Sequence, residues 1–203
     1  MTVQARRQRE KQLLRQEILD AARSLFIREG YENVSMRKIA EKIDYSPTTI
    51  YLYFKDKSEL LFAVCQETFA RLAQELKAIE GTSSDPVEAL KAGLRKYVEF
   101  GLRHPQHYTL TFMIPHEHGM DRTRYLSPES MGMKTFAFLG RGIEECVRRK
   151  KFRRVDIQTA AQALWAAIHG VTSLLISHKE FPWVKREVLV DTVIEAAVKN
   201  LRA

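Results

Sequence analysis

Residues 35–60 read SMRKIAEKIDYSPTTIYLYFKDKSEL, and helix starts are marked three times within this one stretch. The side chains of three of its residues are of the types whose oxygen caps a helix N-terminus: Ser35, Ser46 and Asp56. Pro47 stands at a first helical position, and Glu59 is placed to complete a capping box. About two residues, Asp44 and Tyr45, separate the first helix from the second, and Asp tolerates the left-handed conformation of a tight turn. The stretch therefore predicts short helices joined by tight turns.

A longer helix is expected upstream of this stretch. Apolar residues recur at helical spacing from Leu14 to Phe26, and Gly30 is a stop signal. Residues 2–11 are basic and nearly devoid of large apolar side chains, and Glu10 is their only acidic residue. We expect residues 1–11 to form a flexible basic arm.

Downstream, helical patterns continue and neither a strand nor an internal repeat is found. A long amphipathic helix follows Leu61, and Gly81–Ser84 is the clearest linker. The further segments are a helix from Asp85 to about His104, a shorter helix over 108–113, a loop over 115–126, and helices from Ser127, over 157–177 and over 186–200. The predicted fold class is all-α, with an N-terminal domain of residues 1–60 and a larger helical domain of residues 61–203.

The composition agrees with a helical globular protein. The chain has 203 residues and a formal net charge of +8. Hydrophobic residues make up 45% and charged residues 29%, which is ordinary for a globular protein and excludes a disordered chain. Nine glycines and six prolines are fewer than the roughly 24 that average usage predicts, which favours helices over many short strands. Cys65 and Cys146 cannot form a disulfide framework or a zinc site. No apolar leader follows the first residues, so we expect a cytoplasmic location.

A pattern of spaced positions between Ile18 and Leu60 is more specific than this outline. Its members are Phe26, Gly30, Tyr31, Ser35, Ile39, Ala40, Ser46, Ile50, Tyr51, Phe54, Lys57 and Leu60. This pattern, and above all the run TIYLYFKDKSEL from Thr49, resembles the N-terminal domain of the TetR family of transcriptional regulators. Asp44 and Thr48 depart from the pattern, where Gly and a small Gly or Ala are common. The resemblance implies a three-helix, helix–turn–helix DNA-binding domain.

The residue types also suit contact with double-stranded DNA. Pro47, Thr48 and Thr49 open the second short helix, where side chains would meet base edges in the major groove. Hydroxyls and cations around them suit phosphate oxygens; these are Ser35, Ser46, Tyr51, Tyr53, Lys55 and Lys57. In the alternative interpretation Tyr51 is a core aromatic and Lys57 a solvated charge. Phe54 is expected in the core, and Leu52 in packing rather than in contact.

The C-terminal part carries a shorter resemblance. Leu164–Gly170 (LWAAIHG) resembles the Trp…His-Gly helix of one C-terminal subgroup of the family, and HPQHYTLTF from His104 fits it too. The resemblance implies dimerisation and binding of a small-molecule effector, which we cannot name. Independently, the uncharged 157–177 helix and the small-residue face of 186–200 favour a homodimer through these two helices.

Aromatic, Met and His residues of the middle helices are the candidates for an effector pocket. They are Phe100, Tyr108, Phe112, Met131, Phe136, Trp165 and His169. A plain hydrophobic core explains most of them equally well, and His169 fits a hydrogen-bonded core histidine better than a ligand contact.

Other functional classes find little support. His104, His107, His116 and His118 invite a metal site, but the last two lie in the expected loop without supporting ligands, so we expect solvated histidines and no metal. No nucleophile setting or Gly-rich phosphate loop is present, so we expect neither an enzyme nor a cofactor. The uncharged residues 157–177 could span a bilayer by length, but polar residues interrupt them and Ala dominates, so we expect a buried helix and no membrane contact.

These observations predict a one-component, effector-responsive transcriptional regulator that binds a palindromic operator as a dimer. Repression relieved by a small molecule is the mode that the resemblance implies. The alternative is a helical interaction module whose degenerate DNA-reading helix no longer binds DNA. The intact row of Thr48, Thr49, Tyr51 and Lys57 speaks against that alternative.

Overall fold

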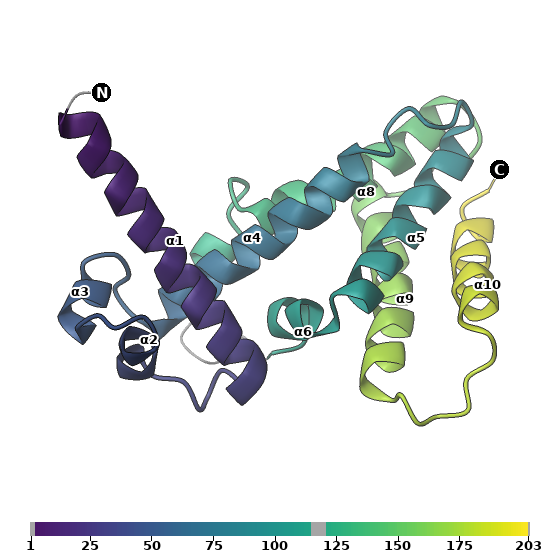
Figure 1. The fold of residues 1–203 in the computed structure, drawn as a ribbon. Coiled ribbons are helices and arrows are strands. Elements are labelled where there is room, and N and C mark those ends of the chain that lie inside the picture. The colour runs from purple at the N-terminus through teal and green to yellow at the C-terminus, as the bar shows by residue number, and fades with distance from the viewer. Residues whose placement is uncertain (1–2, 115–120, 203) are drawn as a thin grey trace.

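The computed structural model describes residues 3–114 and 121–202, and its regular elements are helices (Figure 1). Within these residues the only β-type pairing is an isolated bridge between Phe152 and Arg202. The all-α prediction is therefore confirmed.

The N-terminal helices begin where the caps predict. They are α1 (Val3–Glu29), α2 (Met36–Lys42), α3 (Pro47–Tyr51) and α4 (Lys57–Lys77). The Ser35 side chain accepts the Lys38 N–H at 3.2 Å, and Ser46 accepts the Thr49 N–H at 3.2 Å. Asp44 takes a φ of 57° in the turn between α2 and α3, the left-handed conformation expected of it.

Helix α1 is longer than the sequence pattern predicts. Residues 3–11 continue it as a helix, which corrects the expectation of a flexible arm. Ala, Arg, Gln, Lys and Glu are strong helix formers, and Arg6 pairs with Glu10 one turn away at 2.8 Å. Since the packed part of the helix supplies the nucleus, these residues extend it one hydrogen bond at a time. Gly30, with a φ of +80°, follows its C-terminal end as expected.

Helix α4 joins the two halves of the molecule. Asp56 accepts the Glu59 N–H at 2.8 Å and caps this long helix directly, so no separate short helix precedes it. Glu59 accepts the N–H of Lys55 at 2.7 Å, one residue before the position that a standard capping box uses. The expected boundary at residues 60 and 61 thus falls inside one continuous helix.

The C-terminal helices follow the predicted order with local differences. They are α5 (Pro86–Arg103), α6 (Pro105–Tyr108), the π-helical turn η1 (Thr109–Met113), α7 (Arg122–Tyr125), α8 (Met131–Arg148), α9 (Ile157–Ser177) and α10 (Arg186–Lys199). Ser130, not Ser127, caps α8 by accepting the Met133 N–H at 3.2 Å, because Ser127 instead accepts the Glu129 N–H in a turn. The described part of the expected loop contains α7.

Two hydrophobic clusters form the core, and α4 contributes to both. The first packs α1, α2 and α3 around residues such as Phe26, Ile50 and Leu60. The second lies among α4, α5, α8, α9 and α10, around residues such as Leu72 and Leu164. Figure 1 shows α4 running diagonally from the first group of helices to the second.

Among the described residues one helix, α9, is long enough and apolar enough to cross a membrane, judged by its length and composition alone. Leu164, Ile168 and Thr172 on one side of it are buried, and it packs against α5, α8 and α10. This is the pattern of an interior helix with one exposed face.

Two glycines on α5 give a matched test of this packing. A Cβ at Gly101 would lie 2.8 Å from Tyr108 Cδ2 and closer still to Thr172, whereas one at Gly93 would meet only Leu76 Cδ2 at 4.0 Å. We expect Gly101→Ala to lower the free energy of unfolding by about 1–3 kcal/mol through overpacking. Gly93→Ala should raise it by up to about 1 kcal/mol through helix propensity. Urea unfolding measures both, and equal effects of the two substitutions would contradict the packing at Gly101.

Candidate nucleic-acid interface and effector cavity

The short helix α3 presents its first turn to solvent. Pro47 and Thr48 are exposed, while Thr49 is half-buried and its hydroxyl lies 2.9 Å from the Ser46 hydroxyl. Ile50 is fully buried and anchors the helix in the first hydrophobic cluster. Thr48 is therefore held on a rigid support with its hydroxyl and methyl groups facing outward.

The aromatic residues after α3 divide between core and surface. Tyr51 is 54% exposed, and Leu52 beside it is 76% exposed. Phe54 is 1% exposed, as expected for a core residue, and Tyr53 is half-buried against the same cluster. Among these residues Tyr51 is placed for contact with a partner molecule.

Lys57 is engaged within the protein, which the sequence did not reveal. Its ammonium donates to the Tyr31 carbonyl at 2.8 Å and lies 4.1 Å from the centroid of the Tyr31 ring. Lys55 is exposed. The Ser35 and Ser46 oxygens accept backbone N–H groups in capping, and each hydroxyl still has a proton to donate to an acceptor such as a phosphate oxygen.

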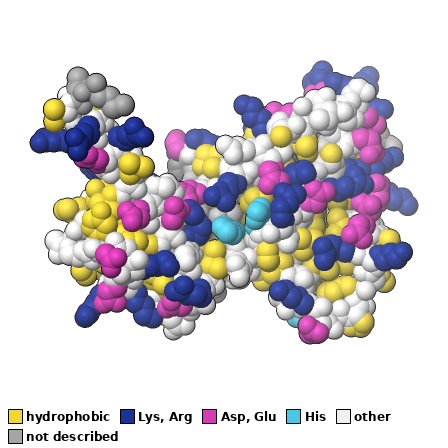
Figure 2. Space-filling model, in the orientation of Figure 1, with side chains coloured by type: hydrophobic (Ala, Val, Ile, Leu, Met, Phe, Trp, Pro, Cys, Tyr) yellow, Lys and Arg dark blue, Asp and Glu magenta, His cyan; other side chains and the backbone are white. Residues whose placement is uncertain are grey.

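The N-terminal end of α1 forms a basic projection. The sequence predicts its basic character, but it is helical rather than a flexible arm. Residues 3–13 are exposed, and Figure 2 shows Lys and Arg side chains gathered at this end of the molecule. Further along, the Arg15 guanidinium lies 4.9 Å from the centroid of the Phe54 ring. The cations of residues 3–11 are thus carried on a helix that continues from the helix–turn–helix domain.

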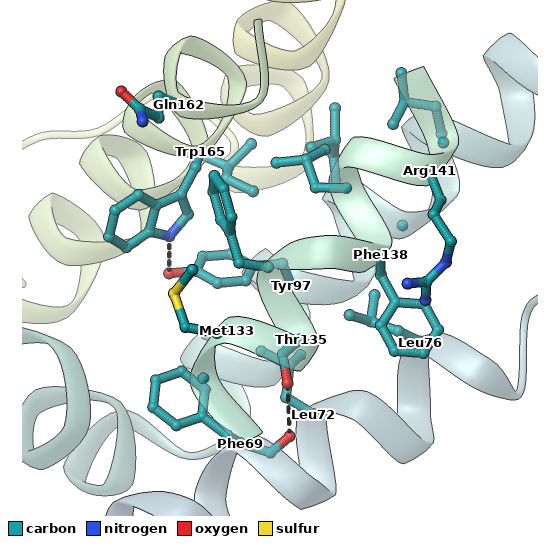
Figure 3. Close-up of a pocket in the computed structure, with 18 of the residues that line it drawn as sticks. Phe69, Leu72, Leu76, Tyr97, Met133, Thr135, Phe138, Arg141, Gln162 and Trp165 are labelled. Carbon is teal, nitrogen blue, oxygen red and sulfur yellow. Dashed lines mark hydrogen bonds between the residues drawn. The ribbon is translucent and has the colours of Figure 1, made fainter. Parts of the chain in front are cut away.

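A cavity of about 820 Å³ lies between α4, α5, α8 and α9 (Figure 3). Three of the predicted pocket residues line it, namely Phe112, Phe136 and Trp165. The other four lie outside its lining: Phe100 and Tyr108 are buried in the second cluster, Met131 packs on the first, and His169 neighbours Trp165.

Several lining residues went unrecognised in the sequence. Leu72, Leu76, Leu90 and Leu94 come from α4 and α5, where helical periodicity marks them only as apolar. Their spacing is the same whether a helix face meets another helix or a cavity, so no local signal distinguishes the two. Gly93 faces the same space, and its missing side chain was the one available hint.

Four polar side chains form a network beside the cavity. The Tyr108 hydroxyl lies 2.5 Å from His169 Nδ1 and 3.0 Å from the Tyr97 hydroxyl, and the Trp165 indole N–H donates to Tyr97 at 3.1 Å. Burial lowers the pKa of His169, and burial raises the pKa of Tyr108 to about 12. His169 Nδ1 and the Tyr108 hydroxyl thus share a hydrogen bond within the protein.

The structure offers no candidate metal centre in the parts it describes. The His104 and His107 rings lie 6.0 Å apart, and no group of three or more potential ligands occurs among the described residues. His116 and His118 lie outside the described residues.

A helix–turn–helix with an exposed first turn, joined to a helical domain that holds a cavity, defines a class of DNA-binding regulators. Residues 18–64 match the family model "Bacterial regulatory proteins, tetR family", and residues 90–201, more than half of the chain, match "Tetracyclin repressor-like, C-terminal domain". The chain belongs to the TetR family of transcriptional regulators. Proteins of this family are regulatory transcription factors rather than enzymes, and they bind DNA and form dimers.

Individual relatives agree with this assignment. An HTH-type transcriptional regulator of Staphylococcus aureus (strain bovine RF122 / ET3-1) is 36% identical over 86 residues, 42% of this chain and 46% of the relative, so the match spans about half of its length. A protein of unknown function from Rhodococcus sp. RHA1 has a similar fold, with a TM-score of 0.79, 21% identity and coverage of 94% of this chain and 96% of its own. The fatty acid degradation regulator FadR from Bacillus halodurans gives a TM-score of 0.74 at 21% identity, covering 93% of this chain and 96% of its own.

The half-buried His169 makes stability depend on pH. Because the pKa of His169 is lowered in the folded chain, the unfolded chain binds a proton first as pH falls below its ordinary pKa of about 6.5. The stability that this residue contributes is thus present above about pH 6.5 and decreases below it. We expect the free energy of unfolding to fall less between about pH 7.5 and pH 5.5 in His169→Gln than in the wild type.

Urea unfolding at the two pH values measures this difference. His107, whose pKa is lowered by burial and by Arg23 and Arg71, keeps part of the dependence in the wild type and in the variant. An unaltered pH dependence in His169→Gln would contradict the half-buried, neutral state.

Proposed function

We propose that the chain is a cytoplasmic, effector-responsive repressor that binds a palindromic operator as a homodimer. Residues 1–60 serve as its DNA-binding domain, and residues 61–203 dimerise and hold the effector. The observation that carries this proposal is the first turn of α3, where Thr48 is exposed on a helix fixed by the Ser46 cap and the buried Ile50.

The contacts of this turn divide by what they can recognise. Thr48 offers a hydroxyl and a methyl group to base edges, which is direct readout of sequence. Ser46, Tyr51, Tyr53 and Lys55 surround it with hydroxyls and a cation that suit phosphate oxygens. The basic N-terminal end of α1 adds a second set of phosphate contacts beside the half-site.

The exposed faces of α9 and α10 support the dimer. Ala163, Gly170 and Leu174 follow one another along the outer side of α9, and Leu174 is 45% exposed. Val188 and Ala196 continue this surface on α10. Small side chains let helices of two copies approach closely, and twofold symmetry then matches a palindromic site.

The cavity supports the response to an effector. It is lined by Phe69 and Phe112, which pack on the first hydrophobic cluster, and by residues such as Leu72 of the second. A ligand held there contacts both halves of each subunit. It releases DNA if it binds better to the conformation whose half-site spacing mismatches the operator.

Substitutions at the DNA face separate base contacts from phosphate contacts. Thr48→Ala should change the preference among duplexes by about 1–3 kcal/mol of discrimination, because it removes a base-edge contact. Removal of residues 1–11 should weaken binding to all duplexes alike and flatten the slope of log K against log salt by about 0.9 per lost phosphate contact. Selection from a randomised duplex pool, followed by salt titrations, measures both effects.

Lys57→Ala provides a second phosphate test. It should also weaken all duplexes equally and flatten the salt slope by about 0.9. Since Lys57 contacts Tyr31, circular dichroism and urea unfolding must first show that the variant is folded. If no duplex binds the wild type better than bulk DNA at moderate salt, the alternative of an interaction module without DNA binding replaces the proposal.

The dimer face predicts the effect of a single buried charge. Leu174→Glu should raise the dimer dissociation constant by at least about 100-fold, because an unpaired carboxylate would be desolvated between the subunits. Lys179→Glu, just beyond the end of α9, is the control and should leave the dimer intact. Sedimentation of the wild type as a 23.5 kDa monomer at tens of micromolar would contradict the dimer itself.

A further inference from the structure

The cavity has two chemically different ends. One end lies toward α1–α3 and the other, here called the distal end, lies where α4 and α8 finish and α5 and α9 begin. The lining toward α1–α3 is apolar and aromatic, from residues such as Phe69, Phe112 and Met133. The polar atoms on that side are satisfied within the protein, since Thr135 donates to the Met131 carbonyl at 2.6 Å and Trp165 donates to Tyr97.

All charged lining residues lie at the distal end. They are Glu80 in the turn after α4, and Arg141 and Glu145 in the last turns of α8. Gln158 and Gln162, from the first half of α9, add exposed amides to the same region. A molecule that fills the cavity therefore meets an apolar environment along most of its length and polar groups at one end.

One guanidinium at the distal end is free to bind an anion, beside the two lining carboxylates Glu80 and Glu145. Arg141 is the only Lys or Arg in the lining, and no carboxylate within the described residues forms an ion pair with it; its guanidinium lies 4.3 Å from the centroid of the Phe138 ring. The Glu145 carboxylate is already bound by Arg148 at 2.6 Å and by Arg149 at 2.7 Å. The unpaired guanidinium is thus available for a carboxylate.

The length of the cavity favours an extended molecule. Its lining on α8 runs from Gly132 to Glu145, a rise of about 20 Å at about 1.5 Å per residue. An extended acyl chain such as that of dodecanoate fits within this span. With about 820 Å³ of space the cavity holds such a chain entirely.

We propose that the cavity binds an amphiphilic carboxylate, with its acyl chain directed toward α1–α3 and its carboxylate at Arg141. This inference rests on the proposed effector response and names the chemical class of the ligand. The aromatic residues Phe69 and Phe112 then meet the end of the chain, so chain length decides how strongly a ligand acts on the first hydrophobic cluster.

Binding to the purified full chain tests the head group and the tail separately. The probes are octanoate, dodecanoate, methyl dodecanoate and dodecyltrimethylammonium, each below its micelle concentration, followed by calorimetry and by the fluorescence of Trp165 in a Trp183→Phe background. We expect dodecanoate to bind more tightly than octanoate, and more tightly than the ester or the cation. Equal or tighter binding of the cation or the ester overturns the proposal, as does the absence of binding by any probe.

Arg141→Gln tests the site of the carboxylate. It should weaken dodecanoate binding about tenfold and leave the ester unchanged, because only the anion loses a charge-assisted hydrogen bond. Arg154→Gln, an exposed cation outside the lining, is the matched control and should change neither. Equal effects of the two substitutions would place the carboxylate elsewhere and overturn the assignment.

Gly93→Leu tests the path of the chain. The Cβ has room, so the variant should fold, while the added side chain occupies the middle of the cavity. We expect dodecanoate to lose affinity far more than octanoate does, and an equal loss for both would contradict the orientation. A chain that binds its operator but none of the probes overturns this inference alone, whereas one that binds dodecanoate without release of DNA supports the ligand class and contradicts the proposed effector response.

Discussion

The continuity of α4 is the constraint on which the rest of the structure depends. Its first half, with Leu60 and Val64, is buried in the cluster that holds α1–α3, and Leu72 further along is buried in the other cluster. Because the backbone of a helix is hydrogen-bonded along its whole length, sharp kinks occur mainly at a proline, a glycine pair or a bulge. Helix α4 (Lys57–Lys77) contains neither proline nor glycine. Any change at one cluster that moves α4 therefore moves the helix–turn–helix.

The cavity is lined by residues of both clusters, so a ligand in it contacts the residues that position α4. Phe112 packs on both clusters, and its ring lies 5.1 Å from Phe69 of α4 and 5.7 Å from Tyr97 of α5. It stands on η1, a π-helical turn, and π turns are often found at functional sites. Its ring also lies 4.7 Å from the Tyr108 ring, so Phe112 packs directly against the hydrogen-bonded Tyr97, Tyr108 and His169. Phe112 therefore joins this network and the cavity to Phe69 of α4.

The features predicted correctly from the sequence are those that depend on interactions between neighbouring residues. The caps at Ser46 and Asp56 and the left-handed turn at Asp44 were correct because each depends on a side chain and its own neighbouring backbone. The helical form of residues 3–11 differs from the predicted flexible arm. A lack of apolar residues does not prevent a helix here, because the packed helix that follows removes the cost of nucleation. The sequence predicts that α8 begins at Ser127, whereas Ser130 caps it, because Ser127 instead accepts the Glu129 N–H in a turn.

The candidate site was harder to predict for a different reason. The residues predicted to contact DNA follow one another in a short segment, so a sequence pattern brings them together. The structure adds that Lys57 is held by Tyr31. The cavity instead draws on four helices, and a residue such as Phe100 or Leu90 has the same apolar character whether it faces the interior or an empty space. Residues that line the cavity differ from core residues only in their neighbours across the bundle. The most informative of these neighbours are Gly93, which lacks a side chain, and Arg141, whose guanidinium is unpaired. In the proposed complex with an amphiphilic carboxylate, Gly93 leaves room for the acyl chain and Arg141 leaves a positive charge for the carboxylate to match.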